Sequence, residues 1–175
     1  MNPHPPDNQG SLIIGIDPGT ARTGFGIIRQ KPSGKLDVID YGIITTPVGQ
    51  AMAARLKDLY ASLVQIIEKY HPESSAVEKL FFQRNVSTAM SVGQAKGVAI
   101  LALAQAEISV EEYSPSEIKL AVSGYGGADK RQMQEMVKVI LKMKSLPKPD
   151  DAADALAVAI CHCHSRKIRS LGEHK

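Results

Sequence analysis

The sequence contains no tryptophan, three phenylalanines and two cysteines among its 175 residues. It also lacks any apolar run near the roughly 18 residues that a membrane-spanning helix requires. Its first residues have neither the basic nor the apolar stretch of a signal peptide, so they are expected to form a loose leader. Cys161 and Cys163 lie two apart in a segment typical of a helix, where their side chains would point to different faces. A disulfide scaffold is therefore excluded, and a cytoplasmic location without membrane association is expected.

The run Cys161-His162-Cys163-His164 has the residue types of a zinc site. Alternate residues of a helix face different ways, however, and the chain has no second cluster of such ligands. We therefore interpret His162 as structural and do not expect zinc.

The chain also lacks a strong overall charge, because its formal net charge is only +3. Basic residues are nevertheless concentrated between Asp129 and Lys148, where six lysines and arginines face two acids, a local charge of +4. Apolar residues make up 43% of the chain and charged residues 22%, which is typical of a globular protein and argues against disorder. The length suits a single domain.

Apolar runs and turn signals predict five strands and several helices. The expected strands are Ser11–Ile16, Thr23–Gln30, Lys35–Thr46, Ser75–Phe82 and Ile108–Tyr113. Two long helices are expected over Met52–Tyr70 and Ser87–Glu107. A short helix should follow, capped by Ser114 and starting at Pro115, and then one that begins at a capping box of Asp129 and Gln132 and ends near Met143. A last helix should run from Asp150 or Asp151 to about Arg166. Short connections make the first three strands antiparallel, and helices separate the later ones. The pattern predicts an α/β fold with a mixed five-stranded sheet and helices on both faces.

Four carboxylates occur in apolar segments, where burial of a charged group is energetically unfavourable. Asp17 ends an apolar strand, Glu78 interrupts another, and Asp151 and Asp154 open an apolar helix. Each has an ordinary structural explanation: an Asx turn for Asp17, an ion pair with Lys79 or a neighbouring base for Glu78, and helix-terminus roles for the two helical acids.

The four acids suggest a metal site when they are taken together. Asp151 and Asp154, at positions i and i+3, project from one side of the helix and repel unless a cation lies between them. A central first strand would bring Asp17 beside Glu78. Four oxygen ligands suit Mg²⁺ or Mn²⁺, and two such ions about 3.5–4 Å apart can promote phosphodiester hydrolysis. Asp150, directly after a proline, fits the role of helix cap better than Asp151 does.

Two lysines are candidates for a contact with a phosphate. Lys130 shares a helix side with the apolar Met133 and Val137, so it should aim inward along the sheet, where a cation could meet a scissile phosphate. The alternative is a lysine that snorkels to the surface. Lys119 allows the same two interpretations.

The segment after Glu78 contains aromatic and polar residues. Phe81 and Phe82 should point to opposite faces, so that one packs in the core and the other can stack on an unpaired base, worth ~1–3 kcal/mol. Gln83, Arg84 and Asn85 then supply donors in a loop suited to phosphates.

The segments GIDPGTARTGFGII, AVEKLFF, GQAKGVAI and DDAADALAVAICHCH resemble the RuvC family of Holliday-junction resolvases, crossover junction endodeoxyribonucleases with an RNase H-like fold. The resemblance runs from about Leu12 to His164. It implies a single RNase H-like nuclease domain over 12–167, after a leader at 1–11 and before a tail at 168–175. The departures are a longer leader, Lys79 after the glutamate, and the fifth acid Asp150.

The resemblance also implies roles for individual residues. The metal-binding catalytic acids would be Asp17, Glu78, Asp151 and Asp154. Lys119 and Lys130 match basic residues near the scissile phosphate, and Phe81 matches an aromatic that contacts bases at the junction centre.

The implied activity is paired, Mg²⁺-dependent cleavage of two symmetric strands of a four-way DNA junction in homologous recombination and DNA repair. Mn²⁺ is expected to substitute, with two ions per site. A homodimer and a partnership with a branch-migration helicase are also implied. Ala89, Gly93 and Gly97 form a small-residue stripe that permits close approach of another helix, either within the chain or from a second copy.

Two rival functions come from other classes. GIDPGTARTG resembles the phosphate-binding hairpin of actin/Hsp70-like ATPases, but such a site needs two lobes and this chain has room for about one. A catalytically silent DNA-binding module on the same fold is the other, although four acids near DNA without metal would repel phosphates.

Overall fold

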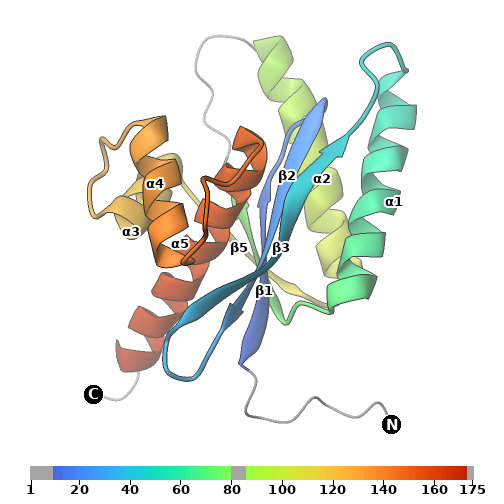
Figure 1. The fold of residues 1–175 in the computed structure, drawn as a ribbon. Helices are drawn as coiled ribbons and strands as arrows, with labels where there is room; N and C mark the ends of the chain where they lie inside the picture. The colour runs from blue at the N-terminus through green and yellow to red at the C-terminus, as the bar shows by residue number, and fades with distance from the viewer. Residues whose placement is uncertain (1–9, 80–85, 173–175) are drawn as a thin grey trace, which may run out of the picture.

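A five-stranded sheet in the order β3-β2-β1-β4-β5 forms the middle layer of the fold (Figure 1). The computed structural model describes residues 10–79 and 86–172. The strands are β1 (Ser11–Asp17), β2 (Arg22–Gln30), β3 (Leu36–Thr45), β4 (Ser74–Glu78) and β5 (Ser109–Tyr113). β1, β2 and β3 pair antiparallel, whereas β4 is parallel to both β1 and β5. The predicted mixed sheet is confirmed, with its first strand at the centre.

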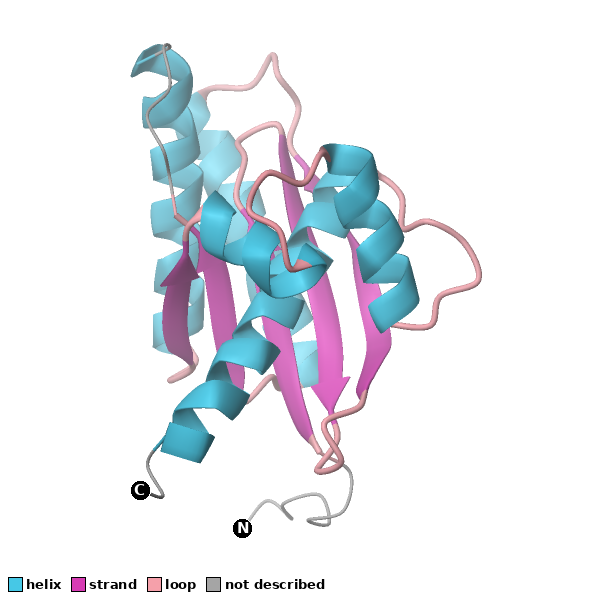
Figure 2. Cartoon of the chain, turned by 90° about the vertical axis from the view of Figure 1, so that its left-hand side faces the viewer, coloured by secondary structure: helices cyan, strands magenta, loops and turns pink. Residues whose placement is uncertain are grey.

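Helices cover both faces of this sheet, as predicted. α1 (Met52–Tyr70) and α2 (Val86–Gln105) lie on one face. The other face, which points toward the viewer in Figure 2, carries α3 (Pro115–Ser123), α4 (Lys130–Ile140) and α5 (Asp150–Gly172). No helix in residues 10–79 or 86–172 is long and apolar enough to cross a membrane.

The side chains of β1 alternate between two hydrophobic cores. Ile13 packs in the core beneath α3, α4 and α5, while Ile14 and Ile16 pack in the core beneath α1 and α2. All three are fully buried. Because the central strand packs against a core on each side, its last residue, Asp17, is held in a fixed position.

Capping boxes begin both short helices. The Ser114 hydroxyl accepts from the Glu117 amide at 3.2 Å, and the Glu117 carboxylate accepts from the Ser114 amide at 2.7 Å. Asp129 and Gln132 make the same reciprocal pair, at 2.8 and 2.9 Å. Both predicted N-termini are confirmed, and the second one places Lys130 in the first turn of α4.

Most element ends lie within two residues of the prediction, and the largest differences are at the ends of α4, α5 and β4. α4 ends at Ile140 rather than near Met143, because Lys142 adopts a left-handed φ of 52°. α5 continues to Gly172, past the predicted end near Arg166. β4 ends at Glu78 and Lys79 already lies outside the strand, while Leu80–Phe82 of the predicted strand lie outside the described residues.

Glycines let α5 lie directly against the backbone of β1 and β2. A Cβ atom at Gly24 would overlap the carbonyl oxygen of Asp151, and one at Gly15 would overlap the backbone of Ala155 and Ala159. Glycine at these positions therefore allows the close approach. The contact fixes the N-terminal end of α5 beside the end of β1.

Candidate active site

Asp17 and Glu78 lie side by side because they end two parallel neighbouring strands. Ile16 of β1 is paired with Val77 of β4, and the two acids follow directly. Their carboxyl groups share a hydrogen bond. Burial, together with the nearby charges of Glu78 and Asp154, raises the pKa of Asp17 to about 8, so this pair retains a proton at neutral pH.

The first turns of α5 bring the other two acids to the same edge of the sheet. Burial raises the pKa of Asp154, although the ammonium of Lys130 opposes the shift. Asp151 forms an ion pair with Arg22 at the start of β2, with 3.1 Å between Oδ2 and the guanidinium Nε. All four predicted acids thus lie at this edge of the sheet, near enough for the charges of Asp151 and Asp154 to contribute to the raised pKa of Asp17.

Lys130 reaches this acidic cluster from α4. Its Nζ lies 3.1 Å from Oδ2 of Asp150 and 3.5 Å from Oδ2 of Asp154. Partial burial disfavours its charge, but hydrogen bonding to Asp150 and the charge of Asp154 outweigh that effect and raise its pKa. Lys130 is directed toward the acids, on the side of α4 that the sequence indicated, although its side chain is 55% exposed.

A hollow of about 230 Å³ joins the acids to the lysines. Glu78, Asp154, Lys119 and Lys130 line it. Its remaining walls are largely apolar, formed by Pro115, Ile118, Met133, Ala157 and Val158. The hollow therefore combines anionic and cationic groups on an apolar support, a surface that can hold a metal ion and a phosphate together.

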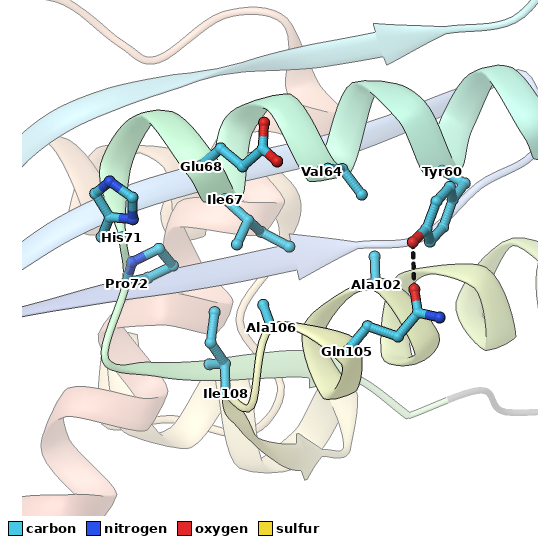
Figure 3. A pocket seen from close by; sticks show the side chains of 10 residues that line it. All are labelled: Tyr60, Val64, Ile67, Glu68, His71, Pro72, Ala102, Gln105, Ala106 and Ile108. Carbon is cyan, nitrogen blue, oxygen red and sulfur yellow. Dashed lines mark hydrogen bonds between the residues drawn. The ribbon is translucent and has the colours of Figure 1, made fainter.

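A larger hollow, of about 420 Å³, lies away from these acids between α1, α2 and the residues that follow each of these helices (Figure 3). Tyr60 donates a hydrogen bond to Gln105 across it, and Glu68 and His71 lie along its α1 side. None of the predicted site residues lines it.

The ordinary explanations for the acids can be compared with the observed contacts. Lys79 pairs with Glu117 at 3.9 Å rather than serving as the partner of Glu78. The turn after Asp17 is closed by Thr23, whose hydroxyl donates to the Gly19 carbonyl at 2.6 Å. The expectation that Asp150 caps α5 is wrong, because Asp150 is itself the first helical residue and its carboxylate binds side chains of α4.

The structure places the remaining candidates elsewhere or leaves them undescribed. Phe81, Phe82, Gln83, Arg84 and Asn85 lie outside the described residues. His162 is buried, with Nδ1 3.0 Å from the Tyr113 hydroxyl and Nε2 3.2 Å from Ser74 Oγ, at the opposite end of β4 from Glu78. Burial raises the thiol pKa of Cys161 to about 11 and of Cys163 to about 12, so both thiols stay protonated at neutral pH.

Sequence reasoning missed Arg22 and Gln134. Gln134 donates to Oδ1 of Asp150 at 2.9 Å. Its position four residues after Lys130 was an available signal, because such residues share a helix face. No sequence pattern pointed to Arg22, because its partner Asp151 is far away along the chain. The two residues meet only because α5 packs against β2.

The donor set fits a hard divalent cation. Carboxylate oxygens are the ligands that Mg²⁺ and Mn²⁺ prefer, and the raised pKa of Asp17 and Asp154 reflects crowding and burial that a cation would relieve. As the side chains lie, no three histidine, cysteine or acidic residues within the described ranges form a ready metal-binding group. Asp154 and Asp151 instead form ion pairs with two basic side chains of the protein, Lys130 and Arg22.

The sheet order and helix layers are those of an RNase H-like nuclease, with Asp17 and Glu78 at the ends of two central strands. A family model described as "Crossover junction endodeoxyribonuclease RuvC" matches residues 13–162. The chain belongs to the RuvC family of crossover junction endodeoxyribonucleases. Nucleases of this family are metal-dependent.

Named relatives and solved structures agree with this assignment. The crossover junction endodeoxyribonuclease RuvC of Chloroflexus aggregans is 57% identical over 152 residues, covering 87% of this chain and 92% of that protein. The RuvC of Roseiflexus sp. is 55% identical and covers 87% and 90%. The structure of T. thermophilus RuvC in complex with Holliday junction substrate superimposes with a TM-score of 0.86 at 32% identity, covering 90% of this chain and 96% of that one.

Proposed function

We propose that this protein resolves four-way DNA junctions by paired, metal-dependent hydrolysis of phosphodiester bonds in homologous recombination and DNA repair. The observation that carries the proposal is the convergence of Asp17, Glu78, Asp151 and Asp154 beside a hollow that Lys119 and Lys130 also line. Family membership supports the substrate class, because a relative of the same fold binds a Holliday junction. The nuclease domain corresponds to 12–167.

The metal ligands are the carboxylates of Asp17, Glu78, Asp151 and Asp154. The metal is Mg²⁺, with Mn²⁺ able to substitute and two ions at each site. When bound, it stabilises the attacking and leaving oxygens of the phosphodiester. To hold the cation, Asp17 and Glu78 would give the proton that they share to solvent, and Asp151 and Asp154 would have to give up their ion pairs with Arg22 and Lys130.

Lys130 and Lys119 act on the phosphate. Both line the hollow that contains Glu78 and Asp154, so a phosphate bound over the acids lies within reach of their ammonium groups. Positive charge at this point stabilises the negative charge that develops on the phosphate oxygens during hydrolysis. Lys130 is the closer of the two to the acids and is the catalytic lysine.

Residues of the segment after Glu78 contact the DNA in this proposal. Phe81 stacks on a base opened at the junction centre, and Arg84 and Asn85 contact phosphates. This assignment depends on the residue types and on their short distance along the chain from Glu78. The protein works in the cytoplasm as a homodimer, because two-fold symmetry matches a two-fold junction and places two sites for paired cuts. A branch-migration helicase of the same recombination system is its partner.

Cleavage of a synthetic four-way junction with Mg²⁺, beside a linear duplex of the same sequence, tests this function. Asp17→Asn and Glu78→Gln keep the side-chain shape but remove ligand charge, so cleavage should fall by orders of magnitude while junction binding survives. Asp37→Asn is the matched control, since this partly exposed acid pairs with Lys31 and Lys35 on the β2–β3 hairpin.

Wild-type cleavage by either site variant would remove that residue from the mechanism. ATP hydrolysis, or junction binding by the wild type without cleavage in Mg²⁺ or Mn²⁺, would instead favour one of the two rival functions.

A further inference from the structure

Asp150 is a fifth acid at the site, outside the four assigned to the metal. Its two carboxylate oxygens have separate partners on α4: Oδ2 lies 3.1 Å from Lys130 Nζ, and Oδ1 accepts from Gln134 Nε2 at 2.9 Å. These partners are one helical turn apart on the same face of α4. One carboxylate at the start of α5 is therefore tied to two side chains of the neighbouring helix.

The contact with Asp150 determines where the Lys130 ammonium lies. Its Nζ is closer to Asp150, at 3.1 Å, than to Asp154, at 3.5 Å. Without Asp150, Asp154 would be the remaining acid in contact with this ammonium among the ion pairs of the described residues. A lysine that settled on Asp154 would occupy an oxygen that the proposed metal site requires.

Stability alone does not explain this arrangement. The side chains of Lys130 and Asp150 are 55% and 60% exposed, and exposed pairs contribute little to folding. Asp150 also does not serve as the helix cap, because it is the first residue of α5. The contacts instead hold the flexible Lys130 side chain in one position beside the proposed active site, where the position of a charged group affects the cleavage rate.

We propose that Asp150, braced by Gln134, is a positioning residue that keeps the Lys130 ammonium at the rim of the site and away from an exclusive ion pair with Asp154. Lys130 is then available to a phosphate and Asp154 to a metal ion. The inference rests on the roles proposed above for Lys130 and Asp154.

A double-mutant cycle of Asp150→Ala and Lys130→Ala tests the proposal with two measurements. The first is the single-turnover cleavage rate at saturating protein. The second is the affinity of the DNA-free protein for Mg²⁺ alone, by calorimetry. Asp150→Ala should reduce both the rate and the Mg²⁺ affinity by about two- to fivefold, the range expected for an exposed ion pair, with junction affinity unchanged. In the Lys130→Ala background the same substitution should change neither quantity, because its effect passes through the lysine.

Two further variants separate positioning from folding. Asp150→Asn keeps an acceptor for Gln134 but removes the charge, and it should reproduce the Asp150→Ala result with an unchanged melting temperature. Asp37→Ala removes an acid with two lysine partners remote from the site, and it should alter neither rate nor Mg²⁺ affinity.

The outcomes distinguish this inference from the proposed function. If Lys130→Ala is slow but Asp150→Ala matches the wild type, the positioning role is overturned and the role of Lys130 stands. Equal losses from Asp150→Ala in both backgrounds would show that its charge acts on the metal directly, which also overturns the inference. Wild-type cleavage by Lys130→Ala would overturn both proposals.

Discussion

At the scale of single residues, the carboxyl group of Asp17 has the most unusual environment in the site. Its raised pKa, about 8, means that the folded protein binds this proton more tightly than the unfolded chain, where an aspartate titrates near 3.8. Between these values the folded state holds more protons, so rising pH reduces stability across that window. Ionised Asp17 is therefore unfavourable for the metal-free fold.

Asp17→Asn should remove this pH dependence. In a buffer with a chelator, the variant should melt at a higher temperature than the wild type near pH 8, and the difference should shrink toward pH 4, where the wild-type carboxyl is protonated in both states. Thermal melts at several pH values between 4 and 8.5 measure the difference. Parallel curves for the two proteins would contradict the assigned pKa shift of Asp17.

The two phenylalanines after Glu78 allow stacking on DNA to be separated from packing. Phe81→Ala should leave the melting temperature nearly unchanged yet impair junction cleavage, since the stacking energy exists only in the complex. Phe82→Ala should cost ~3–5 kcal/mol of stability, as expected for a buried ring. Melts and cleavage assays on both variants decide the matter. A large loss of melting temperature at Phe81, with normal activity per folded molecule, would end its assignment as a DNA contact.

At the scale of helices and strands, the sequence predicted those features that depend on neighbouring residues, such as helix N-termini. The capping box of Asp129 and Gln132 and the Ser114 cap before Pro115 followed from residue types at fixed spacings, although the Glu117 half of the Ser114 box was not predicted. The central position of the first strand followed from the expected mixed sheet. The end of α4 did not: the Lys142 and Met143 amides bond to the Val139 and Lys138 carbonyls, closing a Schellman motif with lysine where glycine is usual. A left-handed lysine gives no sequence signal, so the helix was predicted too long.

The sequence predicted that the four acids lie near one another, but it predicted only some of their contacts with basic side chains of the protein. Lys130 was placed by helix periodicity. The ion pair between Arg22 and Asp151 depends on how α5 crosses β2, and periodicity does not specify which helix crosses which strand. Gly24 leaves room for that crossing, but a single glycine in a strand can equally indicate a bulge or a bend, so the sequence did not reveal it.

Gly24→Ala should displace the start of α5. The added Cβ would overlap the Asp151 carbonyl oxygen, so the helix must move and carry Asp151 and Asp154 away from Asp17. Overpacking of this kind costs ~1–3 kcal/mol, and cleavage should fall further than the lower stability explains, because the carboxylates lose their alignment. Melts and single-turnover rates measure the two effects.

Gly49→Ala is the matched control, because nothing lies within 4 Å of a Cβ at that position. It should change neither quantity. A Gly24→Ala protein with the melting temperature and rate of the wild type would show that α5 does not depend on this close approach.

At the scale of the whole molecule, the site lies where the two halves of the sheet meet. The antiparallel half supplies β1 and Asp17, the parallel half supplies β4 and Glu78, and α5 crosses both with Asp151 and Asp154 at its start. Three elements far apart in sequence thus converge only in the complete fold. Repulsion among their carboxylates opposes that fold, and a bound cation would offset it.

Mg²⁺ should therefore stabilise the whole protein. A ligand that binds only the folded state at one hundred times its dissociation constant adds about 2.7 kcal/mol of stability, so the melting temperature should rise with Mg²⁺ and return to its starting value when a chelator is added. Asp154→Asn should lose most of this rise, because it removes a ligand, whereas Asp37→Asn, far from the site, should keep it. Calorimetric melts across an Mg²⁺ titration provide the measurement. If the melting temperatures of the wild type and Asp154→Asn rose equally, the metal would be binding elsewhere on the protein. If neither melting temperature rose at Mg²⁺ concentrations that support cleavage, the four carboxylates would not hold the metal before DNA binds. A phosphate of the DNA would then have to complete the site.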